Sequence, residues 1–256
     1  MNYDGMKKLS MEEVKKVELD LLITFDAFCK KHHLRYVLDG GTLIGAMRHQ
    51  GFIPWDDDID VAMPFPDFLK FKELYEKECG DSQKQLLYGK NNPYGVHYGK
   101  FVDKRTVVKS DFREDKRLYS VCVDIFPMYS IDDDDSIAQK KIDEILNYYS
   151  KTWLCLCTRF RNPFRKIFHL AFNDMMRKHY MNKIDNILFE HEYGSTNRIR
   201  CVPVVCKKLI TAKNDHFEKP ISVTFEGYDF YAPRDYDEYL TRIYGDYMKL
   251  PPLDKR

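Results

Sequence analysis

The sequence has no long apolar run. No stretch of the 256 residues approaches the ~20 apolar residues that a helix needs to cross a bilayer. Residues 1–16 are charged and have no apolar centre of the kind found in a secretory signal peptide. We therefore expect a cytoplasmic protein, with at most a peripheral contact at the inner face of the cell membrane.

An excess of charge and a cysteine-based metal motif are also missing. The chain has 41 basic and 40 acidic residues, so its composition gives no reason to expect a nucleic-acid partner. None of the seven cysteines forms a C-x-x-C pair, which argues against a structural zinc site. An odd number of cysteines without the density of a disulfide-rich secreted domain favours reduced thiols.

The stretch from residue 36 to residue 63 is the centre of the chemistry. An apolar run at 36–38 leads to Gly40 and Gly41, and Thr42 begins a segment with helical spacing. Glycine allows a ligand to approach the backbone closely, and the first N–H groups of a helix attract anions. The order predicts a phosphate-binding turn at Gly40, Gly41 and Thr42; a simple tight turn is the alternative.

An acidic run follows this turn. Asp58 and Asp60 alternate with apolar residues, so on a strand both carboxylates leave the same face. Carboxylates whose Cα atoms lie only ~6–7 Å apart repel each other unless a cation lies between them. Mg²⁺ and Mn²⁺ accept such oxygen ligands. We expect Asp58 and Asp60 to bind the metal, Asp56 to be a weaker ligand and Asp57 to face solvent.

A third carboxylate is available on another predicted strand. Asp124 lies inside the apolar run 121–126, where an unpaired carboxylate is costly. It therefore binds the metal together with Asp58 and Asp60, or it pairs with a nearby lysine or arginine. Metal binding is the preferred hypothesis.

Three further residues are candidates for substrate contacts. Lys100 carries a compact positive charge that suits the phosphates of a donor. Arg48 lies about two helical turns beyond Thr42, so it either reaches a different anion or anchors the aspartate loop. Trp55 either stacks on a base or sugar or packs beneath the loop.

The sequence patterns in the first half of the chain predict the helices and strands around this stretch. Ser10 and Glu13 form a capping-box signature for an amphipathic helix over 11–31, and Asp67 is placed to cap a second helix. Closely spaced β-rich runs predict antiparallel strands at 85–88, 96–102, 106–109 and 121–126.

The second half of the sequence is predicted to be mainly helical at first. Residues 136–191 are mostly helical, with a break near Asn162 and Pro163. A hairpin within 223–232 and a helix over 235–244, ended by Gly245, follow. We therefore expect a core at 1–135, a helical segment at 136–207 as a candidate acceptor-binding subdomain, and a hairpin and helix at 208–256 that pack back on the core.

The motifs of the central stretch resemble those of a known family. A glycine pair, a short helix and Asp-x-Asp on the next strand are similar to the nucleotidyltransferase superfamily. The stretch GGTLIGAMRHQGFIPWDDDIDVAMP at 40–64 closely resembles the LicD family of phosphocholine transferases, whose wider relatives include the fukutin-related proteins. The resemblance continues through KFVDKRT at 100–106, DIFPM at 124–128 and YGDYMKLPP at 244–252.

The resemblance implies an α+β fold with a polymerase-beta-like mixed sheet, a helical insertion and a C-terminal hairpin plus helix. It also implies transfer of phosphocholine, or a similar phospho-alcohol, from a CDP-activated donor to a sugar hydroxyl. The acceptor would be a cell-surface glycan precursor such as teichoic acid or lipopolysaccharide, which can be lipid-linked. A metal at Asp58, Asp60 and Asp124 would neutralise the donor diphosphate.

Three alternatives stay open. The donor can carry ribitol or glycerol in place of choline, or the enzyme can transfer the nucleotide itself. A non-catalytic module that holds calcium at 56–60 is a further alternative, although no loop has the calcium-binding spacing with a distal glutamate.

Overall fold

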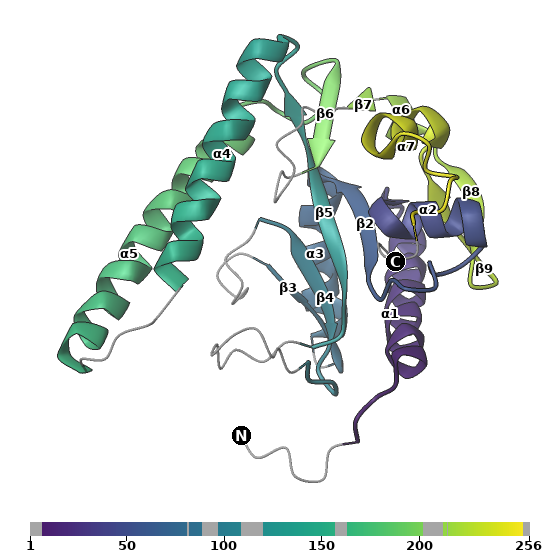
Figure 1. The fold of residues 1–256 in the computed structure, drawn as a ribbon, viewed down its shortest axis with the longest axis horizontal. Helices are drawn as coiled ribbons and strands as arrows, with labels where there is room; N and C mark the ends of the chain where they lie inside the picture. The colour runs from purple at the N-terminus through teal and green to yellow at the C-terminus, as the bar shows by residue number, and fades with distance from the viewer. Residues whose placement is uncertain are drawn as a thin grey trace.

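The computed structural model describes residues 7–80, 82–88, 97–108, 120–156, 163–201, 212–213 and 215–252. Its architecture is α+β, as the sequence predicts, with a mixed sheet between helices (Figure 1). The strands are β1 Val37–Leu38, β2 Ile59–Pro64, β3 Lys84–Leu87, β4 Gly99–Asp103, β5 Cys122–Ile131, β6 Arg198–Cys201, β7 Ala212–Lys213, β8 Ile221–Phe225 and β9 Tyr228–Ala232. The helices are α1 Met11–Lys31, α2 Gly40–His49, α3 Phe65–Cys79, α4 Asp135–Leu156, α5 Pro163–Leu188, α6 Asp215–Glu218 and α7 Tyr236–Tyr244.

The main sheet has seven strands within the described residues, five of them in the order β1-β2-β5-β4-β3, with β6 and β7 joined through β5. The predicted antiparallel pairing is confirmed for β3, β4 and β5. The pair β2–β5 is parallel. Residues 106–108 form no regular strand, because the Thr106 hydroxyl bonds to Asp103 O and to the Val121 N–H in a turn; Lys109 lies outside the described residues.

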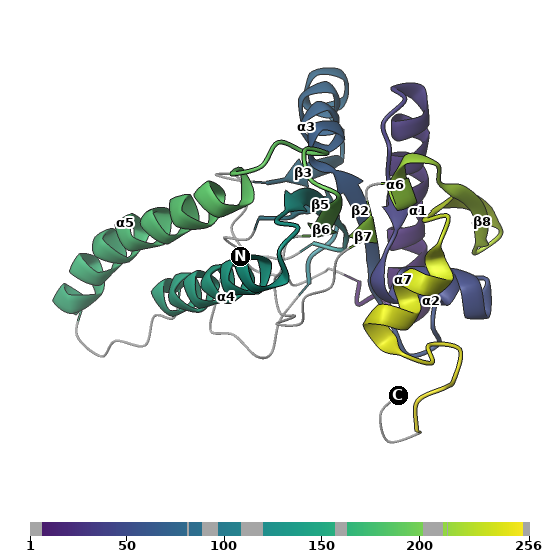
Figure 2. The same ribbon diagram turned by 90° about the horizontal axis from the view of Figure 1, so that it is seen from above.

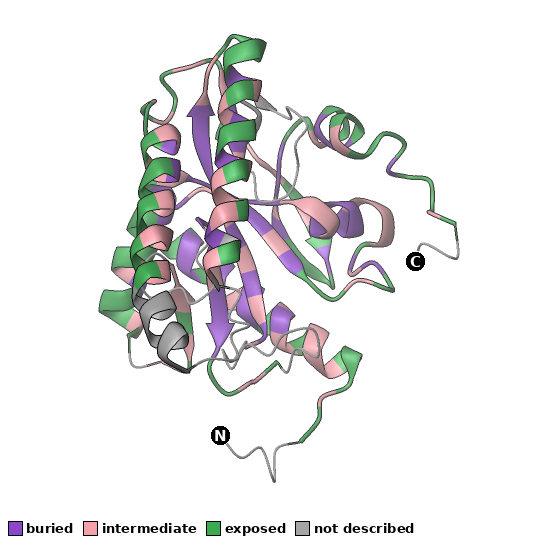
Figure 3. Ribbon diagram, turned by 60° about the vertical axis from the view of Figure 1, so that its left-hand side comes forward, coloured by how far each residue is buried: buried purple, intermediate pink, exposed green. Residues whose placement is uncertain are grey.

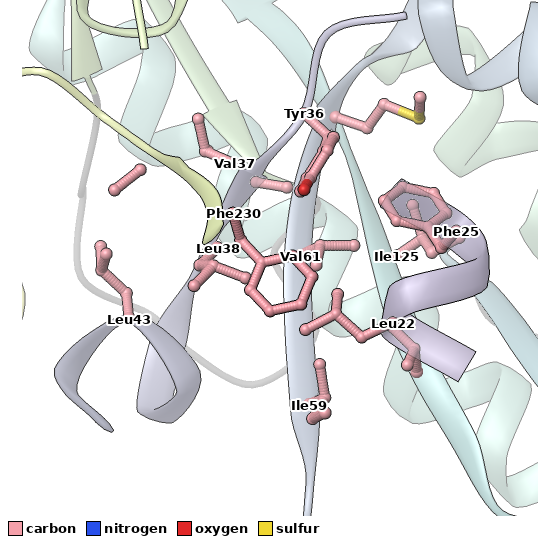
Figure 4. Packing of buried hydrophobic residues seen from close by; sticks show 14 of the residues in the cluster. Leu22, Phe25, Tyr36, Val37, Leu38, Leu43, Ile59, Val61, Ile125 and Phe230 are labelled. Atoms are coloured by element: carbon pink, nitrogen blue, oxygen red, sulfur yellow. The ribbon is translucent and has the colours of Figure 1, made fainter. Parts of the chain in front are cut away.

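Helix α1 covers one face of this sheet. Its capping box is formed as the sequence predicts, with Glu13 N–H donating to Ser10 Oγ and Ser10 N–H donating to the Glu13 carboxylate. Leu22 and Phe25 are fully buried and point toward Ile125 and Val61 of the strands (Figure 4). The buried strands stand out in Figure 3 against helices with exposed outer faces.

Helix α3 begins earlier than the sequence predicts. It starts at Phe65, directly after Pro64, so Asp67 lies in its first turn and does not cap it. Pro66 lies in this first turn, where the N–H that proline lacks has no partner within the helix. Asp67 instead accepts hydrogen bonds from Arg35, with 2.9 Å from Nε and an ion-pair distance of 2.8 Å from Nη2.

Helices α4 and α5 form a long hairpin that extends away from the sheet (Figures 1 and 2). Asp134 Oδ1 caps α4 by accepting from the N–H groups of Ser136 and Ile137. The predicted break agrees with the start of α5 at Pro163, while Asn162 lies outside the described residues. Among the described helices, none combines the length and the apolar composition needed to cross a bilayer.

The C-terminal elements return to the body of the protein. Strands β8 and β9 form the predicted hairpin, and Phe225 and Phe230 belong to the same buried cluster as the sheet. Helix α7 ends at Gly245, whose φ of 72° is readily adopted only by glycine. Strand β6 pairs with β5 although it follows the helical segment; the three-part division of the chain stays a prediction.

Candidate active site

The glycine pair forms the first turn of α2 itself, because the helix begins at Gly40 and not at Thr42. Gly40 has a φ of 53°. A Cβ on Gly40 would lie 2.8 Å from Asp60 Oδ2, and a Cβ on Gly41 would lie 2.5 Å from Asp56 Oδ2. The glycines are therefore needed to let two carboxylates approach the backbone. Phosphate binding by Gly40 and Gly41 stays a prediction.

The start of β2 is tied directly to this turn. The Asp60 N–H donates to Thr42 Oγ1 at 2.8 Å, and the Asp39 N–H donates to Asp60 O at 3.0 Å. Thr42 is buried, and its hydroxyl is occupied by this bond. The two bonds fix the Asp60 backbone relative to the helix N-terminus; the role of Thr42 in holding a phosphate stays a prediction.

Sheet register aligns the predicted residues of three strands. The parallel pair β2–β5 places Asp60 opposite Asp124, and the antiparallel pair β4–β5 places Lys100 opposite Asp124. The expected alternation is present at 59–61, since Ile59 and Val61 are fully buried and Asp60 is not. Asp58, which the sequence predicts on the same strand, lies just before β2. Residues separated widely in sequence thus form one row of charge across the sheet.

Lys100 is the partner of Asp124. Its Nζ contacts both carboxylate oxygens, at 2.6 and 2.8 Å, and lies 5.1 Å from the centre of the Tyr98 ring. Burial lowers the pKa of Lys100, but the attraction of Asp124 outweighs burial and raises that pKa above its ordinary value. The ion-pair alternative for Asp124 is therefore present in the structure, beside Asp60.

The carboxylates of the aspartate run disfavour one another's charge. Loss of hydration and the neighbouring Asp56 raise the pKa of Asp58 to about 6. Burial, followed by the charges of Asp58 and Asp124, raises the pKa of Asp60 well above its ordinary value. The charge of Lys100 lowers this pKa but does not offset the other causes. This group of side chains carries more negative charge than the described residues around it compensate.

The donor set suits a hard divalent cation, although the side chains form no closed cage. Among the described residues, no three His, Cys, Asp or Glu side chains are arranged as a metal-binding group. Mg²⁺ is commonly held by one or two carboxylates together with substrate phosphates, so an open set of Asp58, Asp60 and Asp124 fits by donor type. Metal binding by these residues and by Asp56 stays a prediction.

Asp39 belongs to the site and was missed from the sequence. Its Oδ1 accepts from the Tyr239 hydroxyl at 2.8 Å, and its Oδ2 accepts from Cys201 Sγ at 3.5 Å. Its charge also contributes to the raised pKa of Asp60. The available signal was its position directly before the glycine pair.

Glu18 of α1 is a second residue that was missed. It is only 5% exposed, and its Oε2 has no hydrogen-bond partner among the described residues. Burial, followed by the charges of Asp57 and Asp58, raises its pKa to about 9. The available signal was a carboxylate on the apolar stripe of an amphipathic helix, between Val14 and Leu21.

Arg48 and Trp55 occupy the border of this region. The Arg48 Nη1 donates to Tyr247 O at 2.6 Å, and its Nε donates to His49 at 2.9 Å. These bonds hold the C-terminal segment on α2. Trp55 is 38% exposed and meets His49 edge-on at 6.4 Å, so it is accessible at the surface. Substrate contacts by Arg48, Trp55 and Lys100 stay predictions.

Comparison with known proteins gives consistent matches. Residues 33–168 match the family described as LicD/FKTN/FKRP, nucleotidyltransferase domain. The lipopolysaccharide cholinephosphotransferase LicD of Haemophilus influenzae is 32% identical over 268 aligned positions, which cover 96% of this chain and 94% of that protein. The ribitol 5-phosphate transferase FKRP of human and of mouse is 43% identical over 47 residues, covering 18% of this chain and 10% of each relative.

Proposed function

Because the chain belongs to the LicD/FKTN/FKRP family of nucleotidyltransferase-domain proteins, we propose that it is a transferase. It moves phosphocholine from CDP-choline to a sugar hydroxyl of lipopolysaccharide or a related cell-surface glycan precursor. The relative with matching length is a lipopolysaccharide cholinephosphotransferase, which supports both the transferred group and the acceptor class.

The observation that carries this proposal is the alignment of Asp60, Asp124 and Lys100 beside the N-terminus of α2. The acidic group suits a divalent cation, and the positive end of a helix suits a phosphate. A bound Mg²⁺ or Mn²⁺ supplies charge neutralisation of the donor diphosphate. A site that combines these features is suited to phosphoryl transfer, where positioning and electrostatics account for most of the catalysis.

In the proposed reaction the bond between the phosphocholine phosphorus and the CMP oxygen breaks, and a bond from the sugar oxygen to that phosphorus forms. CMP leaves with the bonding electron pair, and one carboxylate of the site accepts the hydroxyl proton. Lys100 keeps Asp124 in place through its two contacts. The Thr42 hydroxyl holds the Asp60 backbone, so the carboxylates are positioned before substrate binds.

The test is transfer from CDP-choline to a lipopolysaccharide acceptor by purified protein with Mg²⁺ or Mn²⁺, read as CMP release and as choline phosphate gained by the glycan. Asp58→Asn should abolish transfer while thermal unfolding stays cooperative. A protein that folds and keeps wild-type transfer after Asp58→Asn would contradict the assignment of the site.

A second donor class is favoured by one specific observation. This chain matches FKRP, a ribitol 5-phosphate transferase, over 47 residues, so CDP-ribitol, and by extension CDP-glycerol, is the alternative. A panel of these donors distinguishes the cases, and the product distinguishes alcohol-phosphate transfer from nucleotide transfer. We place the reaction in the cytoplasm at the inner face of the cell membrane, which fractionation of cells making the tagged protein tests.

A further inference from the structure

The chain has 18 tyrosines, and they differ in how much of the ring is exposed to solvent. Among the tyrosines of the described residues, Tyr228 and Tyr244 are the exposed ones, with 50% and 49% of their surface accessible. Tyr228 follows the hairpin turn at the start of β9. Tyr244 is the last residue of α7. An exposed ring offers the largest free face to a ligand, so these two are the candidates.

Two anchors hold the segment that contains Tyr244 against the site. Before it, the Tyr239 hydroxyl donates to Asp39 at the N-terminus of α2. After it, Tyr247 O accepts from Arg48 at the C-terminal end of α2, and Lys249 O lies 3.5 Å from the same Arg48 Nη1. The chain therefore follows α2 from its first residue to its last turn, and Tyr244 lies between the anchors.

The surroundings of Tyr244 are acidic. Its pKa is raised by partial burial and then by the charges of Asp39, Asp60, Asp56 and Asp58, in that order. Two of these carboxylates, Asp60 and Asp56, lie against Gly40 and Gly41. Together with the anchors at Asp39 and Arg48, this places Tyr244 at the border of the negatively charged site.

We infer that Tyr244 is a specificity-determining residue that receives the trimethylammonium group of the donor on its ring face. This inference rests on the proposed function. A quaternary ammonium donates no hydrogen bond, so it is recognised by an aromatic face in a negative surrounding. Tyr244 supplies the ring and the four aspartates supply the negative surrounding. A primary ammonium, as in ethanolamine, hydrogen-bonds to carboxylates directly and depends less on the ring.

The experiment compares CDP-choline with CDP-ethanolamine as donors for the wild-type protein and for Tyr244→Leu, Tyr244→Phe and Tyr228→Leu. Tyr244→Leu should lower the ratio of kcat/KM for choline over ethanolamine by about 3- to 30-fold, the range of a cation–π contact. Most of the loss should appear in KM for CDP-choline. Tyr244→Phe keeps the ring face and should keep the ratio.

Tyr228→Leu is the matched control, since it removes an equally exposed tyrosine of the β8–β9 hairpin and should leave the ratio unchanged. Thermal unfolding of each variant separates a folding defect from a change in specificity. An unchanged choline preference in a folded Tyr244→Leu variant overturns the inference and leaves the proposed function standing. If neither the wild type nor Tyr228→Leu uses CDP-choline, the proposed function itself fails, and the inference with it.

Discussion

The sheet that carries the carboxylates and the α4–α5 hairpin are held in different ways. The sheet, α1, α2, α3 and the C-terminal hairpin share one large buried cluster. A much smaller cluster joins the α4–α5 hairpin to β5 and consists of Tyr129, Ile145, Ile184 and Leu188. Leu154 and Met175 of the hairpin are 68% and 57% exposed. The chemistry therefore resides in the part of the protein that packing makes rigid.

The difference bears on function as well as on stability. The aspartates, Lys100 and the glycine pair are fixed by strand register and by bonds to α2. The hairpin presents apolar side chains that the described residues do not cover, and exposed apolar surface commonly marks interaction sites. Transfer by the core and acceptor binding by the helical segment stay predictions.

The largest expected effect is on stability, and it separates the two regions. Phe25 is fully buried and packs edge-on against Tyr36 and Phe71 at 5.0 Å. Phe25→Ala should lower the free energy of unfolding by about 3–5 kcal/mol, measured by urea denaturation. Leu154→Ala in the hairpin should change it by less than about 0.5 kcal/mol. Comparable losses in both variants would show that the hairpin is as tightly packed as the core.

The next effect is on catalysis. Asp60→Asn should reduce transfer about 100- to 1000-fold, the range for loss of one preorganised electrostatic group. Stability without metal should stay equal or rise, because the substitution removes a buried carboxylate that neighbouring charges oppose. The control is Asp57→Asn, which changes an exposed residue of the same run and should leave the rate near the wild type. The measurement is the initial rate of CMP release. An equal loss of rate in both variants would contradict the distinction between Asp60 and Asp57.

A pair of glycine substitutions tests whether the turn makes room for the carboxylates. Gly40 and Gly227 both have positive φ, 53° and 80°, so alanine should cost about 1–3 kcal/mol of stability at either position. Only at Gly40 does a Cβ meet a carboxylate, whereas nothing lies within 4 Å at Gly227. Gly40→Ala should therefore lose transfer and Gly227→Ala should keep it, each assayed at a temperature where both are folded.

The smallest effect is the pH dependence of stability without metal. The pKa values of Asp58 and Glu18 are raised to about 6 and about 9 in the folded protein. Between their ordinary values and these pKa values the folded state binds more protons than the unfolded state, so stability falls as pH rises. Urea midpoints in EDTA should decrease from about pH 5 to pH 9.

Glu18→Gln should flatten the upper part of this dependence, because the side chain no longer titrates. Glu12→Gln, at an exposed position of the same helix, should leave the curve unchanged. A wild-type midpoint that rises with pH over this range would contradict the raised pKa values. Millimolar Mg²⁺ should reduce the decline if the cation binds the carboxylates.

Much of the fold could be predicted where the signal is local. The capping box at Ser10, the break at Pro163, the C-terminal hairpin and the helix end at Gly245 depend on residues a few positions apart. Their conformations follow from hydrogen bonds and steric limits within one turn. The start of α3 was placed wrongly because Asp67 suits an N-cap position whereas Pro66 suits the first helical turn, and these two local signals place the start at different residues.

The sequence by itself determined the order of the central elements and the alternation that buries Ile59 and Val61 while leaving Asp60 on the other face. The tertiary structure decided which distant groups meet the carboxylates. Tyr239 reaches Asp39 across 200 positions, and Lys100 meets Asp124 through the register of β4 and β5. Glu18 faces the aspartate run because of how α1 packs. Such partners depend on strand order and register, which short-range periodicity does not encode.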